Sequence, residues 1–375
     1  GFVNAVLRRV AARDLDAWIA LVAPDPARDP SGYLAVRYSY PRWIVDAFRD
    51  ALGEACAAAE TEDALAAGNI RPDVILAVTP GRAGTPGRAG TPGRAGHGRA
   101  DPADPVTPDP PGTTKTSWSP YGLRLASGDP APLVATGQMT VQDEASQLAA
   151  LALDRVSLTA AGAQAEGAAC ATDRLWLDLC AGPGGKARLL GGLAAERGAR
   201  LLASDIRPHR AARVLGSLRQ GRLAPATSAN PGRTGAVIAA DGLRAPWKPG
   251  TFDRVLVDVP CSNLGSLRRR PEARWRKTPA DVQELAAVQR GLLNAAIDSA
   301  RPGGVVAYVT CSPHLAETRD VVTAVAGGRD DVTILDAPAV LSEVPALHGS
   351  DPRFAQFWPH RHGTDAIFLA LLRRG

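Results

Sequence analysis

From residue 141 onward, short runs of apolar residues alternate with longer segments in which apolar residues recur every three or four positions. The short runs have the length of buried parallel strands, and the longer segments have the period of helices. We predict strands at 175–179, 200–204, 236–239, 254–257 and 304–309, helices at 142–153, 184–195, 208–219, 280–300 and 315–326, and a terminal strand pair near 332–335 and 366–372. This alternation predicts an α/β fold with a mostly parallel, doubly wound sheet and right-handed crossovers.

The first 140 residues have a different pattern. Helical spacing predicts one helix over 2–22 and another around 43–52, and an apolar run predicts a strand at 73–78. Between them and the α/β region, residues 79–96 repeat Thr-Pro-Gly-Arg-Ala-Gly three times, and a stretch rich in proline and aspartate follows. Such a segment has too little apolar surface to offset its ordering entropy. We therefore predict a small domain at 23–140 that contains a disordered insert at 80–114, with order resuming at Trp118.

Composition narrows the class of protein. The apolar fraction of 45% is ordinary for a globular chain, and no uncharged apolar stretch reaches the roughly 18 residues of a membrane span. The five cysteines are odd in number and form no Cys-x-x-Cys pair, which argues against a disulfide framework or a zinc site. We expect a cytoplasmic protein that binds neither membrane nor metal.

The net charge of +5 permits a polyanionic partner. The cations are concentrated in one stretch just after Cys261: Arg268, Arg269, Arg270, Arg274, Arg276 and Lys277. This cluster predicts a phosphate-binding loop, with a solvated basic loop as the alternative. Trp275 lies within it and could either stack on a base or anchor the loop to the core.

A glycine-rich turn follows the predicted strand at 175–179. Its glycines allow the backbone to approach a ligand at a helix N-terminus, but their spacing is not the G-x-G-x-x-G of dinucleotide-binding proteins. Asp205, Asp241 and Asp258 end successive strands, where ligands of such sheets bind. Carboxylates in this register suit S-adenosylmethionine, which carries an amine, a ribose and a sulfonium but no phosphate. The predicted cofactor-binding residues are Cys180, Ala181, Gly182, Pro183, Gly184, Gly185, Lys186, Asp205, Arg210, Asp241 and Asp258.

Two cysteine motifs stand fifty residues apart, Asp258-Val259-Pro260-Cys261-Ser262 and Val309-Thr310-Cys311-Ser312-Pro313. Each follows an apolar run that predicts a buried parallel strand. Both thiols should therefore open onto the crevice that holds the glycine turn, which suggests covalent catalysis on a second substrate. Sequence chemistry alone does not decide which of the two thiols attacks.

These motifs resemble those of the Sun-type RNA cytosine-5 methyltransferases. The resemblance lies in the glycine turn Cys180–Lys186, in Asp258–Leu264 and in Thr310-Cys311-Ser312. It extends to Gln142-Asp143-Glu144-Ala145-Ser146, to His362-Gly363-Thr364-Asp365, and to Phe2–Arg9, which is similar to the end of the NusB-like domain in the bacterial 16S branch. The chain departs from the family pattern at Gly182 and Val259, where alanine is common, and at Asn263, where glycine is common.

The resemblance implies a Rossmann-like S-adenosylmethionine-dependent domain at 141–375. It would be preceded by a small α+β RNA-recognition domain at 23–140 and by a remnant of a NusB-like helical domain at 1–22. The implied activity is formation of 5-methylcytosine in 16S ribosomal RNA, by a protein that we expect to be a monomer. Cys311 would attack carbon 6 of cytosine, Cys261 would promote product release, and the catalytic set would be Cys311, Cys261, Asp258 and Lys186.

Three alternative functions compete with this hypothesis. A DNA cytosine-5 methyltransferase also uses a Pro-Cys thiol but would not require Thr310-Cys311-Ser312. A dinucleotide-dependent oxidoreductase is disfavoured by the glycine spacing and by the two thiols. A non-catalytic ribosome-assembly factor could retain the fold, and a methyl-transfer assay would separate it from an enzyme.

Overall fold

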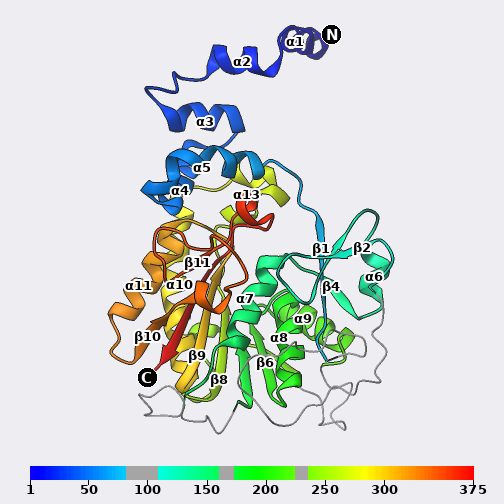
Figure 1. Ribbon diagram of the computed structural model, residues 1–375, viewed down its shortest axis with the longest axis vertical. Coiled ribbons are helices and arrows are strands. Elements are labelled where there is room, and N and C mark those ends of the chain that lie inside the picture. Colours follow the sequence, from blue (N-terminus) through cyan, green and yellow to red (C-terminus); the bar gives the residue numbers. More distant parts are fainter. Residues whose placement is uncertain (82–108, 160–172, 224–234) are drawn as a thin grey trace.

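The computed structural model describes residues 1–81, 109–159, 173–223 and 235–375 (Figure 1). The N-terminal helices lead away from the main body: α1 (Phe2–Val10), α2 (Leu15–Val22), α3 (Pro30–Tyr38), α4 (Arg42–Leu52) and α5 (Glu54–Ala67). The predicted single helix over 2–22 is wrong, because Asp14 starts a new helix. Its side chain accepts a hydrogen bond from Ala17 N (2.8 Å), a helix cap that competes with continuation of the first helix.

A small antiparallel sheet follows, with strand order β2-β3-β1-β4. Its elements are β1 (Val74–Val78), β2 (Thr113–Lys115), β3 (Gly122–Leu125), α6 (Ala131–Ala135) and β4 (Met139–Val141). Order resumes earlier than the predicted Trp118, because Thr113 and Thr114 pair with β3 and β-branched residues favour strands. The predicted insert at 80–114 otherwise lies mostly outside the described residues.

The large sheet has the order β10-β12-β9-β8-β5-β6-β7. The central five strands, from β9 to β7, are parallel, whereas β12 runs antiparallel to β9 and β10 and also pairs with β11. This arrangement confirms the predicted Rossmann-like sheet. The strands are β5 (Leu175–Asp178), β6 (Arg200–Asp205), β7 (Gly235–Ala239), β8 (Phe252–Asp258), β9 (Ala300–Thr310), β10 (Val332–Leu335), β11 (Ala355–Gln356) and β12 (Phe368–Arg374).

Helices cover both faces of this sheet. Alternate residues of β8 face opposite sides, so Leu256 belongs to one hydrophobic core whereas Val255 and Val257 belong to the other. The first core packs under α7 (Glu144–Arg155), α8 (Gly185–Glu196) and α9 (Pro208–Gln220), and the second under α10 (Pro279–Ser299) and α11 (Arg319–Gly327). The predicted helix at 315–326 is interrupted at Thr318, which separates the 3₁₀ turn η4 (Leu315–Glu317) from α11. The remaining elements are the 3₁₀ turns η1 (Gly242–Arg244), η2 (Leu264–Arg269) and η3 (Pro271–Trp275) and the short helices α12 (Ala337–Val340) and α13 (Pro359–His362).

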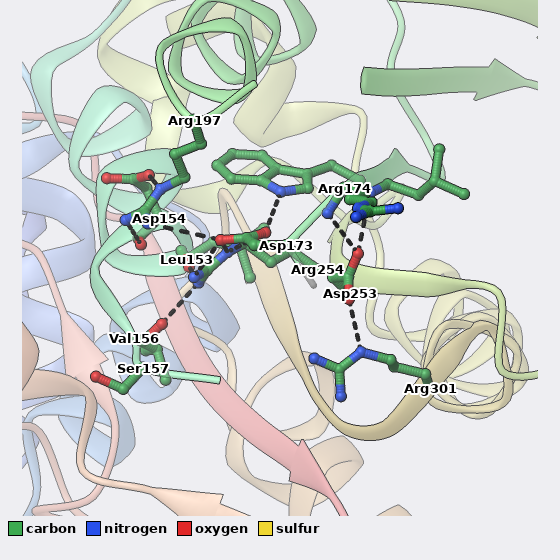
Figure 2. Close-up of polar contacts among 12 residues, drawn as sticks. Leu153, Asp154, Val156, Ser157, Asp173, Arg174, Arg197, Asp253, Arg254 and Arg301 are labelled. Atoms are coloured by element: carbon green, nitrogen blue, oxygen red, sulfur yellow. Dashed lines mark hydrogen bonds and ion pairs between the residues drawn. The ribbon is translucent and has the colours of Figure 1, made fainter. Parts of the chain in front are cut away.

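A charged network joins the elements at the amino ends of the strands (Figure 2). The Arg254 guanidinium, only 2% exposed, donates to Leu153 O and Val156 O (2.5 and 2.7 Å) at the end of α7 and pairs with Asp173 (3.0 Å). Asp253 accepts hydrogen bonds from two backbone amides at the start of β5 and pairs with Arg301 (2.6 Å). These contacts fix α7, β5, β8 and β9 to one another at the amino ends of the strands, opposite the crevice.

The chain order of the strands reverses at β5, whose neighbours are β6 and β8. In open α/β sheets, ligands bind outside the carboxyl ends of the strands at such a reversal. Within the described residues, no helix is long and apolar enough to cross a membrane.

Candidate active site

A cavity of about 370 Å³ opens at this reversal. Five segments that are distant in sequence line it: the start of α7, the β5–α8 turn, the end of β8 with η2, the end of β9, and the residues before β12. Besides the glycine turn and Asp258, three further motifs of the family resemblance reach its wall, through Gln142, Asp143 and Ser146, through Cys311, and through Asp365. His362 instead accepts from Trp358 N (2.9 Å) and contacts Pro345 O, outside the cavity.

Asp205 and Arg210 hold the glycine turn through the backbone of Gly182. Asp205 Oδ2 accepts from Gly182 N (3.1 Å), and Arg210 Nη2 donates to Gly182 O (2.7 Å). A Cβ on Gly182 would meet both side chains, which explains why this chain has glycine where alanine is common in the family. Gly184 has φ +116°, a conformation that L-residues rarely adopt.

The structure brings only part of the predicted cofactor set to the cavity wall. Asp258 lines the cavity together with the turn residues Cys180, Ala181, Gly182, Pro183, Gly185 and Lys186. Asp205 and Asp241 do not line it: the first holds the glycine turn, and the second accepts from Leu243 N (3.0 Å) at the start of η1. Burial raises the pKa of the Cys180 thiol, so this cysteine is an unreactive part of the turn.

Sequence reasoning missed Asp178 and the role of the Gln142 side chain. Both side chains line the cavity and are buried, and neither the carboxylate nor the amide makes a hydrogen bond of ordinary geometry within the described residues. Burial, followed by the nearby Asp258 carboxylate, raises the pKa of Asp178 to about 8. Without a ligand this carboxyl is therefore mostly protonated near neutral pH, and a positively charged ligand beside it would favour the ionised form. The amine and the sulfonium of S-adenosylmethionine carry such a charge. The position of Asp178 at the end of β5, just before the glycine turn, is the sequence feature that could have identified it as a site residue.

Asp178→Asn is expected to remove a pH dependence of stability and to weaken cofactor binding. The pKa of Asp178 is about 8 in the folded protein, against a reference of 3.8, so the folded state retains a proton that the unfolded state loses. Stability should therefore fall as pH rises from about 4 to about 8, and asparagine should abolish this contribution. Cofactor affinity should fall by roughly 1–3 kcal/mol. Thermal melting across this pH range and calorimetry with S-adenosylmethionine would measure both effects; an unchanged pH profile would contradict the assignment.

The two motif thiols lie together at the carboxyl ends of β8 and β9. Cys261 Sγ and Cys311 Sγ are 3.1 Å apart, and Cys311 lines the cavity whereas Cys261 is buried behind it. The hydrogen bond with Cys311, reinforced by burial, raises the pKa of Cys261 well above its ordinary value. Asn263 Oδ1 accepts from Cys311 Sγ (2.9 Å), and Asn263 has φ +61°, where asparagine is the usual substitute for glycine.

Lys186 links the glycine turn to the cysteine motifs. Its Nζ lies 2.8 Å from Asp258 Oδ2 and donates to Ser146 Oγ (3.2 Å). Burial lowers the pKa of Lys186, but the Asp258 carboxylate more than compensates, so the pKa lies above its ordinary value and the ammonium is retained. The Lys186–Asp258 pair thus presents a charged donor and a carboxylate at the cavity wall, close enough to Cys311 for the charges to interact.

A buried polar network beneath the thiols was also missed by sequence reasoning. The serines that follow the two cysteines contact each other, with Ser262 Oγ and Ser312 Oγ 3.1 Å apart. Glu317 is completely buried; its carboxylate accepts from Ser262 N (2.7 Å), from the Ser262 hydroxyl and from Gln289 Nε2 (3.1 Å). Tyr308 OH donates to the Glu317 carbonyl (2.6 Å). The network therefore fixes the Cys261 loop against the Cys311 loop.

Glu317→Gln is expected to separate the two thiols and to reduce turnover by about tenfold, because the amide leaves one buried donor of Ser262 or Gln289 unpaired, at a cost of about 1–3 kcal/mol. Cross-linking of Cys261 to Cys311 by a short bifunctional thiol reagent should slow with it. Glu284→Gln, an exposed glutamate of α10, is the matched control. Unaltered cross-linking in the Glu317 variant would mean that the carboxylate has no positioning role.

The basic cluster differs from its prediction as one phosphate-binding loop. Arg268 and Arg269 both pair with Asp365 (2.7 Å each) and with Asp143 (3.3 and 3.0 Å), two carboxylates buried near the cavity that require cations. Arg274 is also buried, with its guanidinium 3.7 Å from the centre of the Tyr40 ring. The prediction is therefore wrong for Arg268 and Arg274, whose buried side chains hold the fold together. Arg269 pairs with the same carboxylates as Arg268 but is exposed and lines the cavity. Arg270, Arg276 and Trp275 are also exposed, and Lys277 is half-buried.

Fold and site together define the class of the protein. A Rossmann-like sheet carries a glycine turn and an unpartnered buried carboxyl at one strand end, and two thiols at neighbouring strand ends. These are the features of a methyltransferase that uses S-adenosylmethionine. Residues 168–373 match the family model of the 16S rRNA methyltransferase RsmB/F, and the chain belongs to this family. Membership confirms the predicted Sun-type resemblance and the S-adenosylmethionine dependence.

Relatives are similar over the whole chain. A methyltransferase of Mycobacterium tuberculosis (strain H37Rv) is 47% identical over 378 residues, which span 100% of this chain and 72% of the relative. The ribosomal RNA small subunit methyltransferase B of Pseudomonas syringae pv. tomato is 29% identical over 378 residues, spanning 99% of this chain and 72% of the relative. Among solved structures, a methyltransferase homolog from Pyrococcus horikoshii shares the fold, with a TM-score of 0.64 at 18% identity over 94% of this chain and 100% of that one.

Proposed function

We propose that this RNA methyltransferase forms 5-methylcytosine in 16S ribosomal RNA through a covalent bond between Cys311 and carbon 6 of the target cytosine. One observation carries the proposal: the Cys311 thiol lines the same cavity as the glycine turn and lies 3.1 Å from a second thiol. The substrate is inferred from the relative in Pseudomonas syringae, which is named for the small-subunit ribosomal RNA.

The chemistry explains why a thiol is needed. When bound, S-adenosylmethionine supplies an electrophilic methyl group, which carbon 5 of free cytosine is too weak a nucleophile to attack. Cys311 Sγ adds to carbon 6, and the electron pair of the 5,6 double bond shifts toward carbon 4 and ring nitrogen 3, which gives an enamine-like adduct that is nucleophilic at carbon 5. The Lys186 ammonium places a positive charge close to Cys311 at the cavity wall.

The other residues orient the base and release it. Cytosine presents a ring nitrogen acceptor beside an amine donor, and the Lys186–Asp258 pair offers a donor and an acceptor to match this edge. After methyl transfer, a water molecule accepts the carbon 5 proton, the electrons of that C–H bond re-form the 5,6 double bond, and the carbon 6–sulfur bond to Cys311 breaks. Cys261 is held as a thiol by its raised pKa, and from 3.1 Å it can donate a proton to the departing Cys311 sulfur.

A direct assay tests the proposal. The purified protein is incubated with 16S ribosomal RNA and S-adenosylmethionine carrying a labelled methyl group, and the modified base is identified by nucleoside analysis and bisulfite mapping. We expect the label in 5-methylcytosine at defined positions of the RNA. In cells that lack the protein, 5-methylcytosine should be absent from the same positions. Label in another base would overturn the cytosine assignment, and no label would favour a non-catalytic assembly factor.

A further inference from the structure

The α9 segment carries the most one-sided charge in the described catalytic domain outside the cavity. Residues 206–223 contain five arginines and one histidine but no aspartate or glutamate. We define the α9 arginine surface by Arg207, Arg210, Arg213, Arg219 and Arg222. All except the half-buried Arg210 are exposed.

Within the described residues, the α9 arginines other than Arg210 have no ion-pair partner that would explain them structurally. Arg210 alone holds the glycine turn and pairs with Asp205 (3.5 Å). Within the described part of the chain, the side chains of Arg207, Arg213, Arg219 and Arg222 make no ion pair. This contrasts with Arg268 and Arg269, whose charges are neutralised by Asp143 and Asp365.

The charges are also unnecessary for the helix itself. α9 packs on the sheet through Ala211, Val214 and Leu218, and the exposed arginines lie away from this face. Its first turn has no acidic residue and no side-chain cap, although cations near a helix N-terminus are disfavoured by roughly 0.3–1 kcal/mol each. Arg207 at the N-cap therefore carries a charge that costs helix stability, whereas Arg219 lies in the last turn, where the helix dipole favours a cation.

The position of the surface connects it to the reaction. Arg210 donates to Gly182 O (2.7 Å), and Gly182 lines the cavity, so the helix begins at the cavity rim. At the other end, Gln220 lies against the small domain, since a Cβ on Gly137 would be 2.6 Å from Gln220 O. With 13 residues, the helix spans about 20 Å between these points. Figure 1 shows α9 on the side of the sheet that faces β1–β4.

From these observations we infer that the α9 arginine surface binds the phosphate backbone of the RNA strand beside the target nucleotide. The inference rests on the proposed function for the identity of the polyanion as RNA. Arginine suits this partner because its planar fork of donors matches phosphate oxygens. The phosphate-binding role predicted for the loop at 268–277 thus belongs mainly to a helix on another part of the domain.

The test replaces Arg207, Arg213 and Arg219 together by glutamine and leaves Arg210 intact. Binding of a single-stranded 16S RNA fragment is measured across a salt series in the full chain. Each lost phosphate contact flattens the dependence of log K on log salt by about 0.7, so three lost contacts should flatten the slope by about 2. The KM for RNA should rise, while kcat and S-adenosylmethionine affinity stay unchanged.

Two further variants make the result decisive. Arg174, Arg200 and Arg290, three exposed arginines outside α9, are replaced by glutamine together as a control with the same change in net charge. Replacing the three α9 arginines by lysine keeps the charge and should retain most of the slope. A slope change equal to that of the control, or none, overturns the inference. If the glutamine variant flattens the salt dependence but the unaltered protein transfers no methyl group, the α9 arginine surface is supported and the proposed function is contradicted.

Discussion

Cys311→Ala is expected to abolish methyl transfer to RNA, by about 10³-fold or more, while leaving S-adenosylmethionine binding nearly intact. The loss follows from the proposed mechanism, because without the sulfur no electron pair is delivered to carbon 5. Cofactor binding should persist because the glycine turn is held by Asp205, Arg210 and Lys186, none of which depends on the thiol for its main contacts. Transfer of tritium from labelled cofactor to RNA and calorimetry would measure the two properties separately.

Cys56→Ala supplies the control for removing a thiol, because Cys56 packs with the N-terminal helices, away from the cavity. It should retain full activity. Substantial turnover by the Cys311 variant would remove the nucleophile assignment and leave Cys261 as the alternative.

Cys261→Ala should have the opposite outcome and accumulate a covalent protein–RNA adduct. In the proposed mechanism Cys311 still attacks carbon 6, but its sulfur departs slowly without the neighbouring thiol as proton donor. Cys261 does not line the cavity, so the addition step should be little affected. On a denaturing gel, we expect a slowly migrating band that nuclease treatment removes.

The double variant Cys261→Ala/Cys311→Ala identifies the bond, because it should form no such band. A band that persists in the double variant would mean that another nucleophile forms the adduct. Full activity of Cys261→Ala with no band would leave Cys261 as a packing residue.

The parts of the fold that depend on local sequence pattern were predicted well. The five central strands and the helices between them have strong apolar periodicity, and their predicted positions agree closely with the structure. Boundaries without such a signal were missed. The predicted strand at 304–309 in fact begins at Ala300, because residues 301–304 also belong to β9 although they carry no apolar pattern. The break near Asp14 was missed because a single capping side chain decides it.

The site residues that directly follow a strand could be predicted from the sequence. The contacts between residues that are distant in the sequence could not. Strand order places both motif cysteines and the glycine turn at one crevice, and the structure agrees. Glu317 contacts Ser262 across 55 positions, and Arg268 contacts Asp143 across 125, so neither pairing leaves a local trace. The Asp178 carboxylate makes no hydrogen bond of ordinary geometry within the described residues, and a lack of partners can be recognised only in the folded structure.

The charged network around Arg254 divides the molecule into two regions for protein engineering. It fixes the amino edge of the sheet, whereas the thiols, the glycine turn and the substrate-facing side chains all occupy the carboxyl edge. A mutational library aimed at new RNA targets can therefore be confined to the exposed residues at the carboxyl ends of the strands, leaving out the buried Glu317 network and the Asp143 and Asp365 ion pairs. Conversely, heat-resistant variants for structural work can be sought among residues bordering the Arg254 network, where gains in rigidity should leave turnover unaffected.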